Sequence, residues 1–140
     1  MFQLGEGPHH RASIARGGYL PEYEGPNSPE YIDYGGTKNL INAGYSLTVF
    51  DKGGSAVEEL VLSGAQAVKT TREVAEKSSV VITMLPDSQD SEDVILGENA
   101  LLDGSTIGSA ILDMSSIAPG MSKKLGAACE GKNVDFLDAP

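Results

Sequence analysis

Apolar and polar residues follow a regular order only after residue 36. From there, short apolar or alternating runs alternate with stretches of helical period. We predict strands at residues 46–50, 65–68, 79–85, 109–113 and 134–137, and helices at residues 38–43, 56–62, 71–76, 88–96 and 119–129. This alternation indicates βαβ units and an open, mostly parallel sheet flanked by helices, a Rossmann-like α/β fold.

Local chemistry supports several of these boundaries. Gly44 and Gly64 are expected to end helices, and Thr70 to cap the next one. The continuous apolar run before Pro86 is typical of a strand buried on both faces. Cys129 is expected to face the core, as free cysteines usually do.

Residues 1–36 have a different composition. They hold four of the seven prolines, seven of the seventeen glycines and four of the five tyrosines. Because turn and breaker signals follow one another there, we predict an irregular or disordered segment at residues 1–36 and a partial dinucleotide-binding domain at residues 37–140. His9 and His10 are too few ligands for a metal site, so we predict none.

Charge and composition restrict the partners. The net charge of −10 argues against nucleic acid, and no apolar run is long enough for a membrane span. One cysteine and no apolar leader suggest a reducing, cytoplasmic location. Five acids against two arginines in the first 36 residues do not resemble a mitochondrial transit peptide, although a mitochondrial location stays open.

Candidate chemistry follows the predicted strands, because ligands of open α/β sheets bind beyond the carboxyl ends of strands. Asp51 follows one strand, where a carboxylate accepts hydrogen bonds from ribose hydroxyls and disfavours a 2′-phosphate. Lys52 could instead pair with that phosphate. Residues 85–88 and 113–119 bring hydroxyls and amides near helix starts, a geometry suited to anions. The simpler alternatives are a turn cap for Asp51 and helix capping by Ser88 and Ser116.

Six motifs in register carry a resemblance to a known family. They are Asn39-Leu40 to Ala43-Gly44-Tyr45, Phe50-Asp51-Lys52, Val81-Ile82-Thr83-Met84-Leu85-Pro86, Leu96-Gly97-Glu98-Asn99, Leu112-Asp113-Met114-Ser115-Ser116-Ile117-Ala118-Pro119 and Phe136-Leu137-Asp138-Ala139-Pro140. In these the chain resembles the β-hydroxyacid dehydrogenases, which include 3-hydroxyisobutyrate dehydrogenase and tartronate semialdehyde reductase (2-hydroxy-3-oxopropionate reductase) and are related to 6-phosphogluconate dehydrogenase. Two of the motifs, at residues 96–99 and 113–119, resemble the sequence of tartronate semialdehyde reductase more than that of 3-hydroxyisobutyrate dehydrogenase.

The resemblance implies NAD or NADP as cofactor, a short 3-hydroxy acid as substrate and a homo-oligomeric parent enzyme. It implies that Asp51 meets the adenosine ribose, with Lys52 beside it, and that Ser115 contacts the substrate carboxylate. The other implied cofactor contacts are Leu85, Pro86, Asp90 and, at the nicotinamide end, Ser116.

Two expected parts of such an enzyme have no counterpart here. The three glycines of the pyrophosphate-binding turn should fall at Ser28, Glu30 and Asp33, and two of these are acidic. We therefore expect the first strand to be missing, which leaves the strands at residues 46–50 and 79–85 with unpaired edges and the fold marginally stable. The catalytic lysine and the all-helical domain would follow Pro140, so no catalytic residue is assigned.

Three functional interpretations follow. The first is the NAD(P)-binding part of a β-hydroxyacid dehydrogenase, inactive alone. The second is a non-catalytic dinucleotide-binding or protein-interaction module. The third, a receiver-type domain with Asp51 as phosphoacceptor, fits poorly because the acidic pair expected after an earlier strand is absent.

Overall fold

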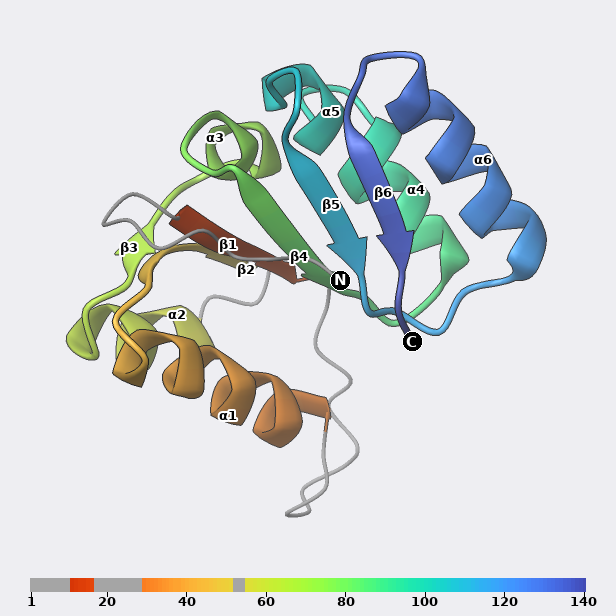
Figure 1. Ribbon diagram of the computed structural model, residues 1–140. Coiled ribbons are helices and arrows are strands. Elements are labelled where there is room, and N and C mark those ends of the chain that lie inside the picture. Colours follow the sequence, from red (N-terminus) through yellow and green to blue (C-terminus); the bar gives the residue numbers. More distant parts are fainter. Residues whose placement is uncertain (1–10, 17–28, 52–54) are drawn as a thin grey trace.

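The computed structural model describes residues 11–16, 29–51 and 55–140, which form a sheet with helices on both faces (Figure 1). The sheet has six strands in the order β3-β2-β1-β4-β5-β6, and every neighbouring pair is parallel. The strands are β1 (Arg11–Arg16), β2 (Ser46–Asp51), β3 (Gln66–Ala67), β4 (Val80–Met84), β5 (Ala110–Asp113) and β6 (Asp135–Asp138). The helices are α1 (Pro29–Asn42), α2 (Ser55–Leu62), α3 (Thr71–Glu76), α4 (Ser88–Leu96), α5 (Leu101–Gly104) and α6 (Pro119–Glu130). The predicted Rossmann-like fold is confirmed.

The prediction of a missing first strand is wrong. Strand β1 lies at the centre of the sheet, with Ile14 in register with Val49 of β2 on one side and Ile82 of β4 on the other. The two neighbouring strands therefore have a partner between them. The unpaired edges that we expected to weaken the fold do not occur.

Helix α1 begins earlier than predicted. It starts at Pro29 and continues through Gly35 and Gly36, so it crosses the boundary predicted at residue 36. Proline fits the first helical position, where its fixed φ suits the helix and its missing N–H has no intrahelical role. Two consecutive glycines disfavour a helix by about 1 kcal/mol each, which is why local pattern alone placed a break there.

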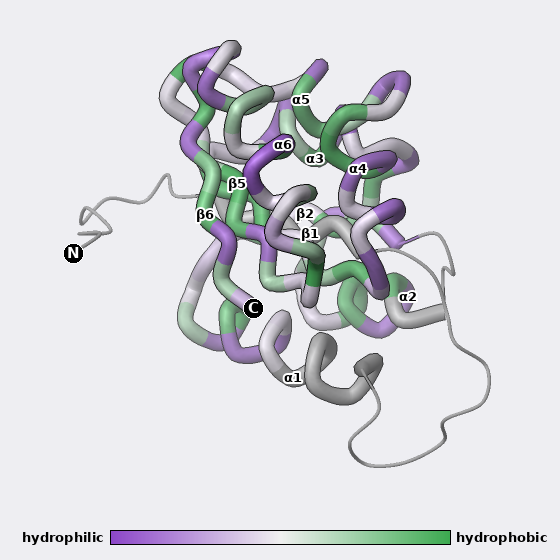
Figure 2. Tube along the Cα trace, turned by 90° about the vertical axis from the view of Figure 1, so that its right-hand side faces the viewer, coloured by the Kyte–Doolittle hydropathy of each residue, from purple (hydrophilic) through white to green (hydrophobic). Residues whose placement is uncertain are grey.

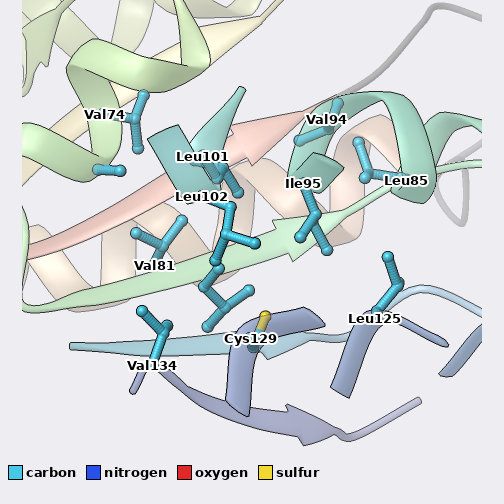
Figure 3. Close-up of a cluster of buried hydrophobic side chains, with 12 residues drawn as sticks. Val74, Val81, Leu85, Val94, Ile95, Leu101, Leu102, Leu125, Cys129 and Val134 are labelled. Carbon is cyan, nitrogen blue, oxygen red and sulfur yellow. The ribbon is translucent and has the colours of Figure 1, made fainter. Parts of the chain in front are cut away.

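Two apolar cores lie on opposite faces of the sheet. The larger core joins strand residues Val81 and Ile111 to α3, α4, α5 and α6, and Figure 3 shows Val81 among side chains from these helices. The smaller core joins Leu47 and Val49 to α1 and α2, with Ile82 packed against it. Hydrophobic residues accordingly follow the strands, while hydrophilic ones mark the outer surfaces of α4 and α6 (Figure 2).

Several local predictions are confirmed. The Thr70 side chain accepts a hydrogen bond from the Glu73 amide (3.2 Å) and caps α3. Gly44 and Gly64 follow helix ends with φ of 90° and 108°, the left-handed region that favours glycine. Cys129 is fully buried in the larger core. Helix α5, which has only four residues, was not predicted because so short a segment shows no period.

Candidate functional site

The carboxyl ends of the parallel strands meet along one edge of the sheet. Asp51, Met84, Asp113 and Asp138 are the last residues of β2, β4, β5 and β6. From β1 the chain continues to β2 and β3 on one side of the sheet, and it then returns to β4 beside β1 and continues to β5 and β6 on the other side. In doubly wound sheets, ligands bind in the crevice between the two strands where the order reverses, here β1 and β4. Among the described residues, the candidate site therefore comprises the carboxyl ends of β1 and β2 and the loops that follow β4 and β5.

Hydrogen bonds join the ends of β4 and β5. The Asp113 carboxylate is fully buried, and its Oδ1 accepts from the Thr83 hydroxyl (2.9 Å) and from the Ser115 amide (3.1 Å). The Ser115 hydroxyl oxygen in turn accepts from the Leu85 amide (2.8 Å). The Ala139 amide, beyond β6, donates to the Asp113 carbonyl (2.9 Å). Three adjacent strand ends are thus linked.

The loop after β5 is also held where α6 begins. The Ser88 hydroxyl oxygen accepts from the Ala118 amide (2.9 Å), which joins the starts of α4 and α6. The alternative interpretation, in which Ser88 and Ser116 cap their helices, does not hold. Asp87 caps α4 by accepting from the Asp90 amide (2.9 Å), and Ala118 stands at the cap position of α6 without a side-chain bond.

The predicted site residues occupy this edge with different exposure. Ser115 is buried and Ser116 is exposed, although they are adjacent. Asp51 is half-buried at the end of β2, and Pro86 is exposed after β4. The remaining positions are Leu85, which is buried, Asp90, which is half-buried in the first turn of α4, and Lys52, which lies outside the described residues.

Sequence reasoning gave no role to Thr83, and it included Asp113 only as the first residue of the candidate stretch 113–119. Both are fully buried polar residues inside strands that otherwise have an apolar pattern on that face. They lie beside each other in the register of β4 and β5. A buried polar residue in an apolar strand was the available signal, since such groups require a hydrogen-bond partner.

The start of α1 bears on the pyrophosphate. Of the three positions where family glycines are expected, Glu30 and Asp33 lie in the first two turns of α1, and Ser28 lies outside the described residues. A helix N-terminus attracts anions, including acidic side chains. Two acidic residues thus stand near the start of α1, where the family resemblance leads us to expect glycines.

A cavity of about 370 Å³ lies at the opposite edge of the sheet. It is lined by Ser46, Leu47, Thr48, Gly64, Gln66 and Lys77. Because these residues come from the amino end of β2, from β3 and from the end of α3, the cavity is separate from the strand ends described above. Within the described ranges, no group of three or more histidine, cysteine, aspartate or glutamate side chains is arranged to hold a metal ion, and no helix is long and apolar enough to cross a membrane.

Comparison with known proteins identifies the family. Residues 36–140 match the NAD-binding domain of 6-phosphogluconate dehydrogenase. The chain belongs to this family. Among relatives of this NAD-binding domain, an NAD-dependent L-serine dehydrogenase from Pseudomonas aeruginosa is 42% identical over 102 residues, which are 73% of this chain and 34% of the relative. A 2-hydroxy-3-oxopropionate reductase from Escherichia coli is 40% identical over 102 residues, 73% of this chain and 35% of the relative. The expected membership of the β-hydroxyacid dehydrogenases is confirmed.

The fold extends further than the sequence match. A 3-hydroxyisobutyrate dehydrogenase from Salmonella typhimurium superposes with a TM-score of 0.77 at 22% identity, over 94% of this chain and 41% of that one. The superposition therefore includes residues before position 36, where the NAD-binding family model does not match. The cofactor class is NAD or NADP, as expected. The chain spans about a third of the length of the curated relatives that it matches.

Proposed function

We propose that this chain forms the ribose and nicotinamide walls of the NAD(P) site of an oxidoreductase that acts on a short 3-hydroxy acid. The observation that carries the proposal is the linked edge at the ends of β4, β5 and β6, next to the reversal of strand order. When bound, the cofactor would supply or take up hydride. Residues of this chain would bind and orient it.

Asp51 would hold the adenosine ribose. It is the last residue of β2 and is half-buried, a position from which a carboxylate accepts hydrogen bonds from vicinal hydroxyls. Leu85, Pro86 and Asp90 would line the site from the β4 side, with Lys52 beside the ribose. A carboxylate at this place favours NAD over NADP, because it repels a 2′-phosphate.

Ser116 would meet the nicotinamide end, which its exposure supports. Ser115 would contact the substrate carboxylate. The Leu85 amide occupies an acceptor position of the Ser115 hydroxyl, and a serine hydroxyl can accept one bond and donate another. The existing bond would therefore orient the hydroxyl proton for donation to a carboxylate.

Calorimetric titration of the purified chain with NADH and with NADPH tests the cofactor site. We expect sub-millimolar binding of NADH and weaker binding of NADPH, with Asp51→Ala reducing NADH affinity about tenfold, as for loss of a charged hydrogen bond. Asp135→Ala is the matched control, because it removes the same charge at the exposed amino end of β6. No binding at millimolar cofactor, or an equal loss in both variants, would contradict the proposal.

We further propose that the chain alone does not turn over substrate, because none of its residues is assigned as proton donor. The test is reduction of tartronate semialdehyde and of methylmalonate semialdehyde with either cofactor. Measurable turnover would show the proposal to be wrong. The second candidate function is a non-catalytic dinucleotide-binding module, which predicts the same cofactor binding. It gains support if the chain binds NADH while neither substrate is reduced, whether by this chain or by a longer form of the protein.

A further inference from the structure

One carboxylate oxygen at the candidate site is buried without a partner. Asp113 has no exposed surface, and among the residues that the structure describes no donor reaches its Oδ2. Burying a charged or polar oxygen without a hydrogen bond is costly, and an apolar side chain of similar volume often serves a buried position as well or better. The packing of β5 therefore does not by itself account for an acid at this position.

The other oxygen, Oδ1, organises the turn that follows β5. It accepts from the Ser115 amide two residues along the chain, an Asx-type turn, and from the Thr83 hydroxyl of β4. These two bonds fix the backbone as it leaves the strand. They also place the Ser115 hydroxyl against the Leu85 amide, at 2.8 Å.

The loop is held again a few residues later. Ala118, at the start of α6, donates its amide to the Ser88 hydroxyl of α4. Ser116 and Ile117 therefore lie between two anchored points, one made by Asp113 and one by Ser88. Of the serine pair, only Ser116 is exposed.

We propose that Asp113 is a positioning residue for the cofactor and substrate contacts, which acts by holding the Ser115 amide and, through the Ser115 hydroxyl, the Leu85 amide. It touches neither ligand. The relevance to binding rests on the proposed function, whereas the hydrogen-bond chain from Asp113 to Leu85 can be tested without any ligand.

Amide hydrogen exchange of the ligand-free 140-residue protein, measured by NMR, tests the order of these hydrogen bonds. In Asp113→Ala, we expect the amides of Ser115 and Leu85 to exchange about tenfold faster. The Ser115 amide loses its acceptor, and the Ser115 hydroxyl that accepts from the Leu85 amide is no longer held in place. In Ser115→Ala, we expect faster exchange at Leu85 alone, since the Asp113 carboxylate still holds the backbone amide at position 115. In Asp113→Asn, the side-chain amide oxygen replaces Oδ1, and protection at Ser115 should be retained.

The Ala110 amide is the reference. It donates to the Ser79 carbonyl at the other end of β5 and is remote from the carboxylate. An equal rise at Ala110 and Ser115 would mean that Asp113 only stabilises the fold, and no change at Ser115 would also overturn the proposal. If Asp113→Ala does not fold, Ser115→Ala and Asp113→Asn decide: equal acceleration of both amides in the first, or lost protection at Ser115 in the second, contradicts the proposed order.

Titration with NADH then tests the proposed cofactor site separately from the positioning role of Asp113. We expect Asp113→Ala to lower affinity about tenfold relative to Asp113→Asn. If the unmodified chain binds no NADH, the proposed function fails while the exchange data still decide on the positioning network. If it binds and Asp113→Ala binds equally well, the positioning role fails while the cofactor site stands.

Discussion

Replacing Gly104 by alanine should destabilise the fold. Gly104 is the buried last residue of α5, and a methyl group there would overlap the carbonyl oxygen of Arg72 in α3. Because that neighbour is backbone, either helix must shift to admit the methyl group. Overpacking of this kind costs about 1–3 kcal/mol, which for a chain of this length lowers Tm by about 4–12 °C.

Gly126→Ala is the matched control, and it should have the opposite sign. Gly126 lies inside α6, and the nearest atom to an added methyl group is Cδ1 of Phe136 at 3.6 Å, an ordinary contact. Alanine is favoured over glycine inside a helix by about 1 kcal/mol. Both substitutions restrict the unfolded chain in the same way, so their difference reports the folded state.

Urea unfolding followed by far-ultraviolet circular dichroism measures both effects. We expect the midpoint to fall for Gly104→Ala and to rise for Gly126→Ala, with the slope m unchanged. A Gly104→Ala protein within about 0.5 kcal/mol of the unmodified chain would refute the close approach of α5 to α3. A destabilised Gly126→Ala protein would instead mean that α6 lies closer to β6.

Three further predictions concern stability and reactivity. Leu101→Ala, in a fully buried position, should cost about 2–5 kcal/mol in urea unfolding, whereas Leu62→Ala, 88% exposed, should change stability by less than about 0.5 kcal/mol. Thr70→Ala should cost about 1 kcal/mol by the same assay, because the Glu73 amide loses its cap, and Thr70→Ser should restore most of it. Burial raises the pKa of the Cys129 thiol from about 9 to about 11, so a thiol reagent at pH 8 should react far more slowly with the folded chain than with the chain in denaturant. The thiol ionises at a lower pH in the unfolded chain than in the folded chain. The contribution of the buried neutral thiol to the stability of the fold should therefore be complete below pH 9 and should be lost as the pH rises toward 11.

The sequence predicted the elements whose signals are local. Thr70, Gly44 and Gly64 mark helix ends by their own chemistry, and the predicted bounds of α3 and α4 are those of the structure. The run that includes β4 was recognised because a strand buried on both faces is apolar throughout. These features depend on few residues that are near one another in the sequence, so they can be predicted without the rest of the fold.

Strand β1 depends on distant residues. The segment Arg11–Arg16 has an arginine at each end and only one large apolar residue, so it does not show the apolar run that a central strand usually has. Its place follows from its partners: Ser46–Asp51 and Val80–Met84 each present an edge that parallel pairing satisfies. A prediction made from one segment at a time does not take into account the backbone groups of β2 and β4 that need a partner.

The difference between Ser115 and Ser116 has the same origin. Both follow the same strand and both are serines, yet only one is turned toward the Leu85 amide, 30 residues away in the sequence. The β-hydroxyacid dehydrogenase motif predicts that the pair belongs to a site, whereas the packing of β4 against β5 decides which hydroxyl is buried. If the two serines divide the work as proposed, Ser116→Ala should weaken NADH binding with little change in urea stability, because its side chain is exposed. Ser115→Ala should lower stability by about 1–3 kcal/mol, because the buried Leu85 amide then lacks its acceptor.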